Sequence, residues 1–192
     1  MAIKVGISGF GRIARVVIRA SMDMPEIEIA GINVRNADLE YLAYMLRYDT
    51  TFGRFPKSLE VYDKGLVIDG KKVPVYSFSE AINIPWKECG AEYIVEATGA
   101  YVTTEKAMDH IKAGAKKVII SAPAKDSVTP TFVYGVNHEN YQADMPVVSN
   151  ASFSSYTIFC GPDKVIDSST TGSSFSFTVT PKEAVFVIPP SV

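Results

Sequence analysis

The start of the chain changes from an alternating hydrophobic pattern to a helical one, which predicts a strand followed by a helix. Ile3, Val5 and Ile7 alternate with other residue types, as side chains do on the two faces of a β-strand. Over residues 12–22 the apolar side chains recur instead at helical spacing, at Ile13, Val16, Val17 and Ala20. The short segment between the two patterns is therefore predicted to turn the chain from strand to helix.

Strands and helices are predicted to alternate over residues 1–150. Further helices are predicted at residues 38–48 and 103–113, and residues 48–55 are predicted to form a polar, aromatic loop. Further strands are predicted at residues 28–34, 59–62, 66–68, 72–76, 93–99, 117–121, 132–136 and 146–149, with Asp69-Gly70 as a hairpin signal. Such alternation is typical of an α/β fold with a doubly wound, mainly parallel sheet.

The turn between the first strand and the first helix carries a glycine pattern of the form G-x-G-x-x-A. Gly9 and Gly11 let the backbone approach a phosphate closely, and Ala14 lets the helix pack against the strand. The helix N-terminus adds unpaired N–H groups and the positive end of the helix dipole. Strand, glycine turn and helix together predict a binding site for the pyrophosphate of a dinucleotide. The alternative is a tight turn that binds no ligand.

The end of the second predicted strand lacks the acidic residue that commonly binds the ribose of NAD. The strand runs into Asn33, Val34 and Arg35, and a valine side chain accepts no hydrogen bond from a ribose hydroxyl. Arg35 is placed to meet the 2′-phosphate of NADP, or it is a solvated loop arginine, the commoner role of a single surface charge. The choice between NAD and NADP therefore stays open from these residues.

Four predicted strand ends carry residues that suit a ligand site. Gly9, Asn33, the pair Thr98-Gly99, and Ser121 each stand at the end of a predicted strand. In open parallel sheets, ligands bind in a crevice at the carboxyl ends of the strands. The positions of these residues therefore predict that they meet at one binding crevice.

Composition describes an ordinary globular chain and excludes several classes of partner. Of the 192 residues, 47% are hydrophobic and 21% are charged, and the formal net charge is −2. No basic run with interleaved aromatic residues is present, so a nucleic-acid partner is not expected. No stretch approaches the ~18 apolar residues that span a bilayer, and the chain enters a predicted strand without a signal peptide. We therefore expect no membrane partner and a cytoplasmic location.

The cysteines and histidines predict no metal site. Cys89 and Cys160 show no metal-ligand spacing, which together with their small number suits a reducing compartment. His110 and His138 are also isolated in the sequence. His110 falls on the helix predicted at residues 103–113, where we interpret it as a surface or packing residue rather than a ligand.

Longer motifs extend well beyond the glycine turn. They are GFGRI (9–13), YD (48–49), IPW (84–86), VEATG (95–99), KKVIISAP (116–123), GVN (135–137) and SNAS (149–152). Together they resemble the cofactor-binding half of phosphorylating glyceraldehyde-3-phosphate dehydrogenase, the enzyme of glycolysis. The resemblance implies an NAD(P)-binding Rossmann-type domain over residues 1–152. It implies that the following residues lie along the NAD or NADP molecule: Gly9, Phe10, Gly11, Arg12, Ile13, Asn33, Val34, Arg35, Thr98, Gly99 and Ser121.

The resemblance ends at the position where the family carries its cysteine nucleophile. Phe153 stands there, directly after Ser152, and a phenyl ring can neither attack an aldehyde nor form a thioester. Cys160 comes seven residues later and is interpreted as a small buried thiol rather than a substitute. No histidine and no arginine follows Phe153. The sequence therefore predicts no catalytic residues and a chain that is truncated relative to the family.

Residues 153–192 form a divergent tail that is rich in serine and threonine. Partial alternation over residues 174–188 predicts a hairpin around residues 180–183, so the tail is expected to be short and β-rich or irregular. Three hypotheses for the whole chain follow. It is a cofactor-binding domain without turnover, a dehydrogenase that is active only with a complementing subunit, or a non-catalytic module. Such a module would form a homo-oligomer or associate with full-length family subunits.

Overall fold

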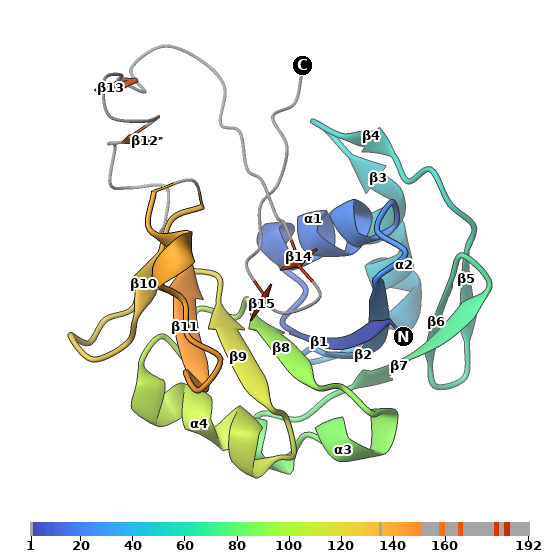
Figure 1. Ribbon diagram of the computed structural model, residues 1–192. Coiled ribbons are helices and arrows are strands. Elements are labelled where there is room, and N and C mark those ends of the chain that lie inside the picture. Colours follow the sequence, from blue (N-terminus) through green and yellow to red (C-terminus); the bar gives the residue numbers. More distant parts are fainter. Residues whose placement is uncertain are drawn as a thin grey trace.

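A nine-stranded sheet in the order β10-β11-β9-β8-β1-β2-β7-β6-β5 organises the chain. The computed structural model describes residues 2–134 and 136–150, together with the backbone of four two-residue strands beyond them (Figure 1). The strands of the large sheet are β1 (Ile3–Ser8), β2 (Ile27–Asn33), β5 (Leu59–Tyr62), β6 (Gly65–Ile68), β7 (Lys71–Tyr76), β8 (Tyr93–Glu96), β9 (Lys117–Ile120), β10 (Thr131–Phe132) and β11 (Val147–Asn150).

The sheet is wound in both directions from its central strand. β1 pairs in parallel with β2 on one side and with β8 on the other. Parallel pairing continues outward from β8 to β9, β11 and β10, and from β2 to β7. The strand order therefore reverses between β1 and β8. These pairings confirm the predicted doubly wound, mainly parallel α/β fold.

Helices cover both faces of the sheet. α1 (Arg12–Ser21) and α2 (Leu39–Arg47) lie on one face, while α3 (Trp86–Cys89) and α4 (Thr104–Lys112) lie on the other (Figure 1). Neighbouring residues of one strand point to opposite faces, so Val95 joins the core beneath α1 and α2. Ile94 joins the core beneath α3 and α4. Burial on both faces explains why β8 and β9 carry buried hydrophobic residues at successive positions, such as Ile94 and Val95.

A meander of β5, β6 and β7 extends one end of the sheet with antiparallel pairing. The tight turn between β6 and β7 places Asp69 at φ 51° and Gly70 at φ 77°, as a two-residue hairpin turn requires. The hairpin predicted from Asp69-Gly70 is therefore confirmed. β7 leaves this meander to pair with β2 through Val75 and Tyr76.

Two sequence predictions are wrong in detail. The strand predicted at residues 132–136 is only β10 (Thr131–Phe132), because the Asn137 side chain bonds the Val133 amide at 2.7 Å and turns the chain. The loop predicted at residues 48–55 contains an antiparallel pair, β3 (Tyr48–Asp49) and β4 (Gly53–Arg54). Two-residue strands are too short to produce a periodic pattern, which is why the sequence did not reveal them.

Little of the tail falls within the described part of the chain. Phe153 and Cys160 lie outside the described residues, so the interpretations placed on them remain predictions. The backbone of β14 (Val179–Thr180) pairs antiparallel with β15 (Glu183–Ala184), which agrees with the predicted hairpin. A second pair, β12 (Ile158–Phe159) with β13 (Val165–Ile166), is also antiparallel.

Candidate functional site

The parallel strands β1, β2, β8 and β9 end along one edge of the sheet, which we call the carboxyl edge. Backbone hydrogen bonds join the chain segments there. The amide of Gly9 donates to the carbonyl of Asn33 at 2.8 Å, and the amide of Ser121 donates to the carbonyl of Glu96 at 3.0 Å. Between them, the Ala97 amide donates to the Ser8 carbonyl at 2.8 Å. The four strand ends singled out in the sequence therefore lie together.

The two glycines of the first turn serve different purposes. Gly9 has a φ of +100°, and a Cβ built on it would lie 2.9 Å from the backbone carbon and oxygen of Ala97. Only glycine fits there, because the turns after β1 and β8 pack backbone against backbone. Gly11 has an ordinary φ of −68°, and no atom of the described residues lies within 4 Å of a Cβ built on it. The missing side chain at Gly11 thus leaves open space beside the helix start.

Helix α1 begins at that open space with free amide groups. Gly11 is its N-cap residue, and no side chain in the described part of the chain caps it. The first helical bond runs from Arg15 N to Gly11 O at 3.1 Å, and the first turn holds no acidic residue. By contrast, α2 and α4 are capped by the side chains of Asp38 and Thr103. The N-terminus of α1 is therefore suited to bind an anion.

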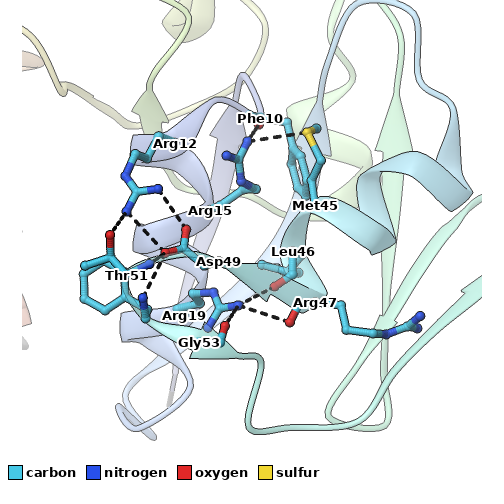
Figure 2. A network of polar contacts seen from close by, with 11 residues as sticks. Phe10, Arg12, Arg15, Arg19, Met45, Leu46, Arg47, Asp49, Thr51 and Gly53 are labelled. Atoms are coloured by element: carbon cyan, nitrogen blue, oxygen red, sulfur yellow. Dashed lines mark hydrogen bonds and ion pairs between the residues drawn. The ribbon is translucent and has the colours of Figure 1, made fainter.

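The side chain of Arg12 reaches the β3–β4 hairpin. Its guanidinium bonds both carboxylate oxygens of Asp49, at 3.1 and 3.2 Å, and the Thr51 hydroxyl at 2.9 Å (Figure 2). Burial of Asp49 would raise the pKa of its carboxyl. Hydrogen bonds from the Phe52 and Thr51 amides and from Arg12 outweigh that effect and lower the pKa. The side chain of Arg12 is therefore engaged by the hairpin. Its backbone amide, at the start of α1, is the group that can contact a cofactor lying along this turn.

Phe10 and Arg15 anchor the glycine turn to the body of the domain. The ring of Phe10 is 4% exposed and belongs to the hydrophobic core. Its carbonyl accepts a hydrogen bond from the Arg15 guanidinium at 2.8 Å (Figure 2). Phe10 therefore offers only backbone atoms at the carboxyl edge. Ile13 likewise packs against the core.

At the end of β2, the Asn33 side chain holds the neighbouring loop. Its amide nitrogen donates to the Phe78 carbonyl at 3.1 Å, and its amide oxygen accepts the Phe78 N–H at 2.9 Å. Val34 is partly buried against the core. Arg35 is exposed, with one contact of 3.5 Å to the Ser79 carbonyl. Of the three residues predicted for the adenosine end, Arg35 is the one whose charged group is available to a ligand.

At the end of β8, the Thr98-Gly99 turn is held from below by Glu96. One oxygen of the Glu96 carboxylate accepts the Thr98 amide at 2.8 Å and also the Thr98 hydroxyl. The Thr98 hydroxyl in turn accepts the Ala100 amide at 3.1 Å. Gly99 takes a φ of +75°, with no described atom within 4 Å of a Cβ built on it. The turn is therefore fixed on its inner side and open on its outer side.

Sequence analysis did not find the residues beneath this turn. The interpretation of His110 as a surface or packing residue is only half right, because the side chain is fully buried and also hydrogen-bonded. Its ring contacts the Glu96 carboxylate at 3.1 Å and the Trp86 indole at 3.0 Å. The available signal was Glu96 itself, a charged residue within a hydrophobic strand. Such a residue is rarely buried without a partner.

Two kinds of site were not found in the part of the chain that the structure describes. Within it, no three His, Cys, Asp or Glu side chains gather as metal ligands would. Nor does any helix there have the length and apolar character needed to cross a membrane.

Comparison with known proteins points to one family. Residues 3–104 match the model of the family described as "Glyceraldehyde 3-phosphate dehydrogenase, NAD binding domain". Glyceraldehyde-3-phosphate dehydrogenases of Coccidioides immitis and Yarrowia lipolytica are each 53% identical over 152 residues, and that of Neurospora crassa is 52% identical over 152 residues. Each match covers 79% of this chain and 44% of the relative. The chain thus spans less than half the length of these relatives.

Proposed function

Because the chain belongs to the glyceraldehyde 3-phosphate dehydrogenase family through its NAD-binding domain, we propose that it binds NAD along the carboxyl edge. The pyrophosphate would lie against the amides of Arg12 and Ile13 at the start of α1. The adenosine would extend toward the end of β2, and the nicotinamide toward Thr98 and Gly99. This is the switch point between β1 and β8, where open α/β sheets bind ligands.

The observation that carries this proposal is the open, uncapped start of α1. Gly11 leaves room for a phosphate, and no side chain of the described residues fills that space. The free amides of the first helical turn need partners, and an anion supplies them. The residues present therefore fit a dinucleotide pyrophosphate.

We infer that the site also tolerates NADP. No carboxylate stands at Val34 to repel a 2′-phosphate, and the next residue, Arg35, has an exposed guanidinium. Arginine binds phosphate through paired N–H groups, whereas NAD offers only a ribose hydroxyl at that point. Loss of Arg35 should therefore weaken the binding of NADP more than that of NAD.

We propose that this chain alone does not oxidise an aldehyde. The bound cofactor would supply a hydride acceptor, but the chemistry of the family also needs a thiolate nucleophile. Phe153 stands at that position, and residues 154–192 hold no histidine to act as a base. Even Phe153→Cys is expected to give no phosphate-dependent NADH from glyceraldehyde 3-phosphate. NADH production by that variant would show that other residues complete a catalytic site.

We also infer that the chain associates with another copy of itself or with a family subunit. The support is a row of exposed aromatic side chains on and after α2: Tyr41, Tyr44, Tyr48 and Phe52. Adjacent exposed aromatic residues are typical of protein interfaces. Sedimentation of the wild type beside Tyr44→Ser tests this idea, since the variant should shift the chain toward the monomer. A monomeric wild type, alone and with full-length enzyme, would contradict it.

Calorimetric titration of the full chain with NAD, and separately with NADP, tests the main proposal. Saturable binding of NAD is expected for the wild type. Arg35→Ala should weaken NADP binding by about tenfold, the loss of one charge-assisted phosphate contact. Arg54→Ala removes an exposed arginine on β4 and serves as the matched control. A folded wild type that binds neither cofactor would overturn the proposal.

A further inference from the structure

A network of hydrogen-bonded side chains extends from the core beneath α3 and α4 to the carboxyl edge. The Trp86 indole donates to His110 Nδ1 at 3.0 Å, and His110 Nε2 lies 3.1 Å from Glu96 Oε2. The other oxygen of Glu96 accepts the Thr98 amide at 2.8 Å. Trp86, on α3, and His110, on α4, are thus linked through β8 to the turn at the edge.

Within this network, the donor and the acceptor of each hydrogen bond can be assigned from the groups that meet. Nδ1 of His110 accepts the indole N–H, so the ring proton resides on Nε2 and is donated to Glu96. The Thr98 amide and hydroxyl also donate to Glu96. A carboxylate only accepts hydrogen bonds, so it satisfies all three donors at once. No neutral amide side chain can do the same, because its NH₂ group would face a donor.

These side chains are tightly enclosed by their neighbours. Trp86 and His110 are fully buried, and Glu96 is 1% exposed. A Cβ on Gly6 would lie 2.7 Å from the Trp86 ring, so the indole sits directly on the sheet at a glycine. The centre of the Tyr101 ring lies 5.3 Å from the centre of the His110 ring, so the tyrosine packs against the imidazole.

Stability alone does not account for burying these groups. A buried carboxylate pays a desolvation penalty that apolar side chains of similar size avoid. The network instead orients the turn, because Glu96 accepts hydrogen bonds from the Thr98 amide and hydroxyl and so sets their direction. The Thr98 hydroxyl then directs the Ala100 amide, on the far side of Gly99.

We propose that Glu96 is a positioning residue for the Thr98–Gly99 part of the cofactor site, with Trp86 and His110 fixing its carboxylate. Glu96 does not touch the ligand in this account, since it lies beneath the turn. It holds the open side of Gly99 toward the edge before the ligand arrives. The inference rests on the proposed binding of NAD, but its first consequence is a property of the free protein.

The test begins with Trp86→Phe in the full chain. This change keeps an aromatic ring but removes the indole N–H that fixes His110. Ile84→Val is the control, because Ile84 is buried in the same hydrophobic cluster and has no polar group. In the free protein, amide resonances of Thr98 and Gly99 should shift in Trp86→Phe and not in Ile84→Val. Exchange of the Thr98 amide with solvent should also become faster.

The second arm measures NAD affinity in a double-mutant cycle with Thr98→Val. Trp86→Phe should weaken NAD binding by about fivefold, and the double variant should lose less than the product of the two single losses, since contacts in one network are not additive. If Trp86→Phe does not fold, Glu96→Gln carries the test, because its NH₂ group leaves one buried donor of the network without an acceptor. The amide resonances of Thr98 and Gly99 should shift in Glu96→Gln and not in Glu92→Gln, whose carboxylate lies in an exposed ion pair.

The outcomes separate this inference from the proposed function. Absence of NAD binding by the wild type would overturn the proposed function, while the amide resonances would still decide whether Glu96 positions the turn. Equal amide shifts in Trp86→Phe and Ile84→Val, or losses in affinity that multiply, would overturn the positioning role. Coupled losses with shifts confined to Trp86→Phe would support it.

Discussion

The turns after β1 and after β8 lie side by side at the carboxyl edge, yet they are built in different ways. The turn after β1 depends on two glycines, which have no side chain. Gly9 allows close backbone packing, and Gly11 leaves open space beside the helix start. The turn after β8 depends on buried polar side chains, with Glu96 holding Thr98 from beneath. The conformation of the first turn therefore requires glycine, whereas that of the second requires a network of hydrogen bonds.

This difference shows how each turn responds to substitution. A closely packed glycine turn is destabilised when a Cβ is introduced, since overlap of the Cβ with backbone atoms cannot be relieved by side-chain rotation. A hydrogen-bonded turn fails when a polar group is exchanged for one of the same shape, because a buried donor loses its acceptor. Substitutions on the two sides should therefore separate these two kinds of failure.

Gly9→Ala should have the largest effect. Its φ of +100° and the 2.9 Å approach of a Cβ to Ala97 backbone atoms leave no relaxed position for alanine. We expect the free energy of unfolding to fall by about 3 kcal/mol, the upper range for a strained backbone position. Denaturant unfolding followed by circular dichroism measures this change. An unaltered midpoint would contradict the close packing of the two turns.

Gly11→Ala is the matched control for that change. Its φ of −68° suits alanine, and the new Cβ would meet no described atom within 4 Å. Stability should change by less than about 1 kcal/mol, as for other substitutions at an N-cap without a side-chain bond. NAD affinity should nevertheless fall at least about tenfold, since the methyl group occupies the space of the phosphate. Wild-type affinity would contradict the proposed pyrophosphate position.

Glu96→Gln should have the next largest effect. The glutamine NH₂ must face either the His110 N–H or the Thr98 donors, so one buried donor is left without an acceptor. The expected loss is about 2 kcal/mol in the free energy of unfolding. Glu92→Gln is the control, because the Glu92 side chain lies in an exposed ion pair with Lys116, and the stability of this variant should match the wild type. Equal effects at the two positions would mean that burial of Glu96 is unimportant.

Asp49→Asn should have the smallest effect and should depend on pH. The pKa of Asp49 is lowered in the folded state, so its ionised form stabilises the fold above the unfolded pKa of about 3.9. Solvent screens the half-exposed Arg12 partner, so we expect about 1 kcal/mol at neutral pH. The difference between wild type and variant should disappear as the pH falls through the folded pKa. A difference that persists in acid would have another cause.

The sequence predicted the sheet and the glycine turn because both depend on local patterns. Alternation marked β1, helical spacing marked α1, and Gly9 and Gly11 marked the turn between them. The short pair β3–β4 and the turn after β10 were not predicted, since they depend on single contacts such as Asn137 to Val133. Propensity of a four-residue run is easily overridden by such contacts.

The network beneath Thr98 could not be predicted from local patterns. Trp86, His110 and Glu96 come from three separate elements, and the indole and imidazole lie 24 residues apart in the sequence. Their pairing depends on how α3 and α4 pack on the sheet. The same holds for Arg12, whose role by resemblance gave no sign that Asp49, 37 residues away, binds its guanidinium.

Mapping of amide resonances during titration with NAD would test the central claim most directly. We expect saturable shifts at Gly11, Arg12 and Ile13 on one turn and at Thr98 and Gly99 on the other. Residues of the β5–β6 hairpin, at the far end of the sheet, should not shift. Shifts that leave both turns unchanged, or no shifts in the folded chain, would contradict a cofactor site at the carboxyl edge.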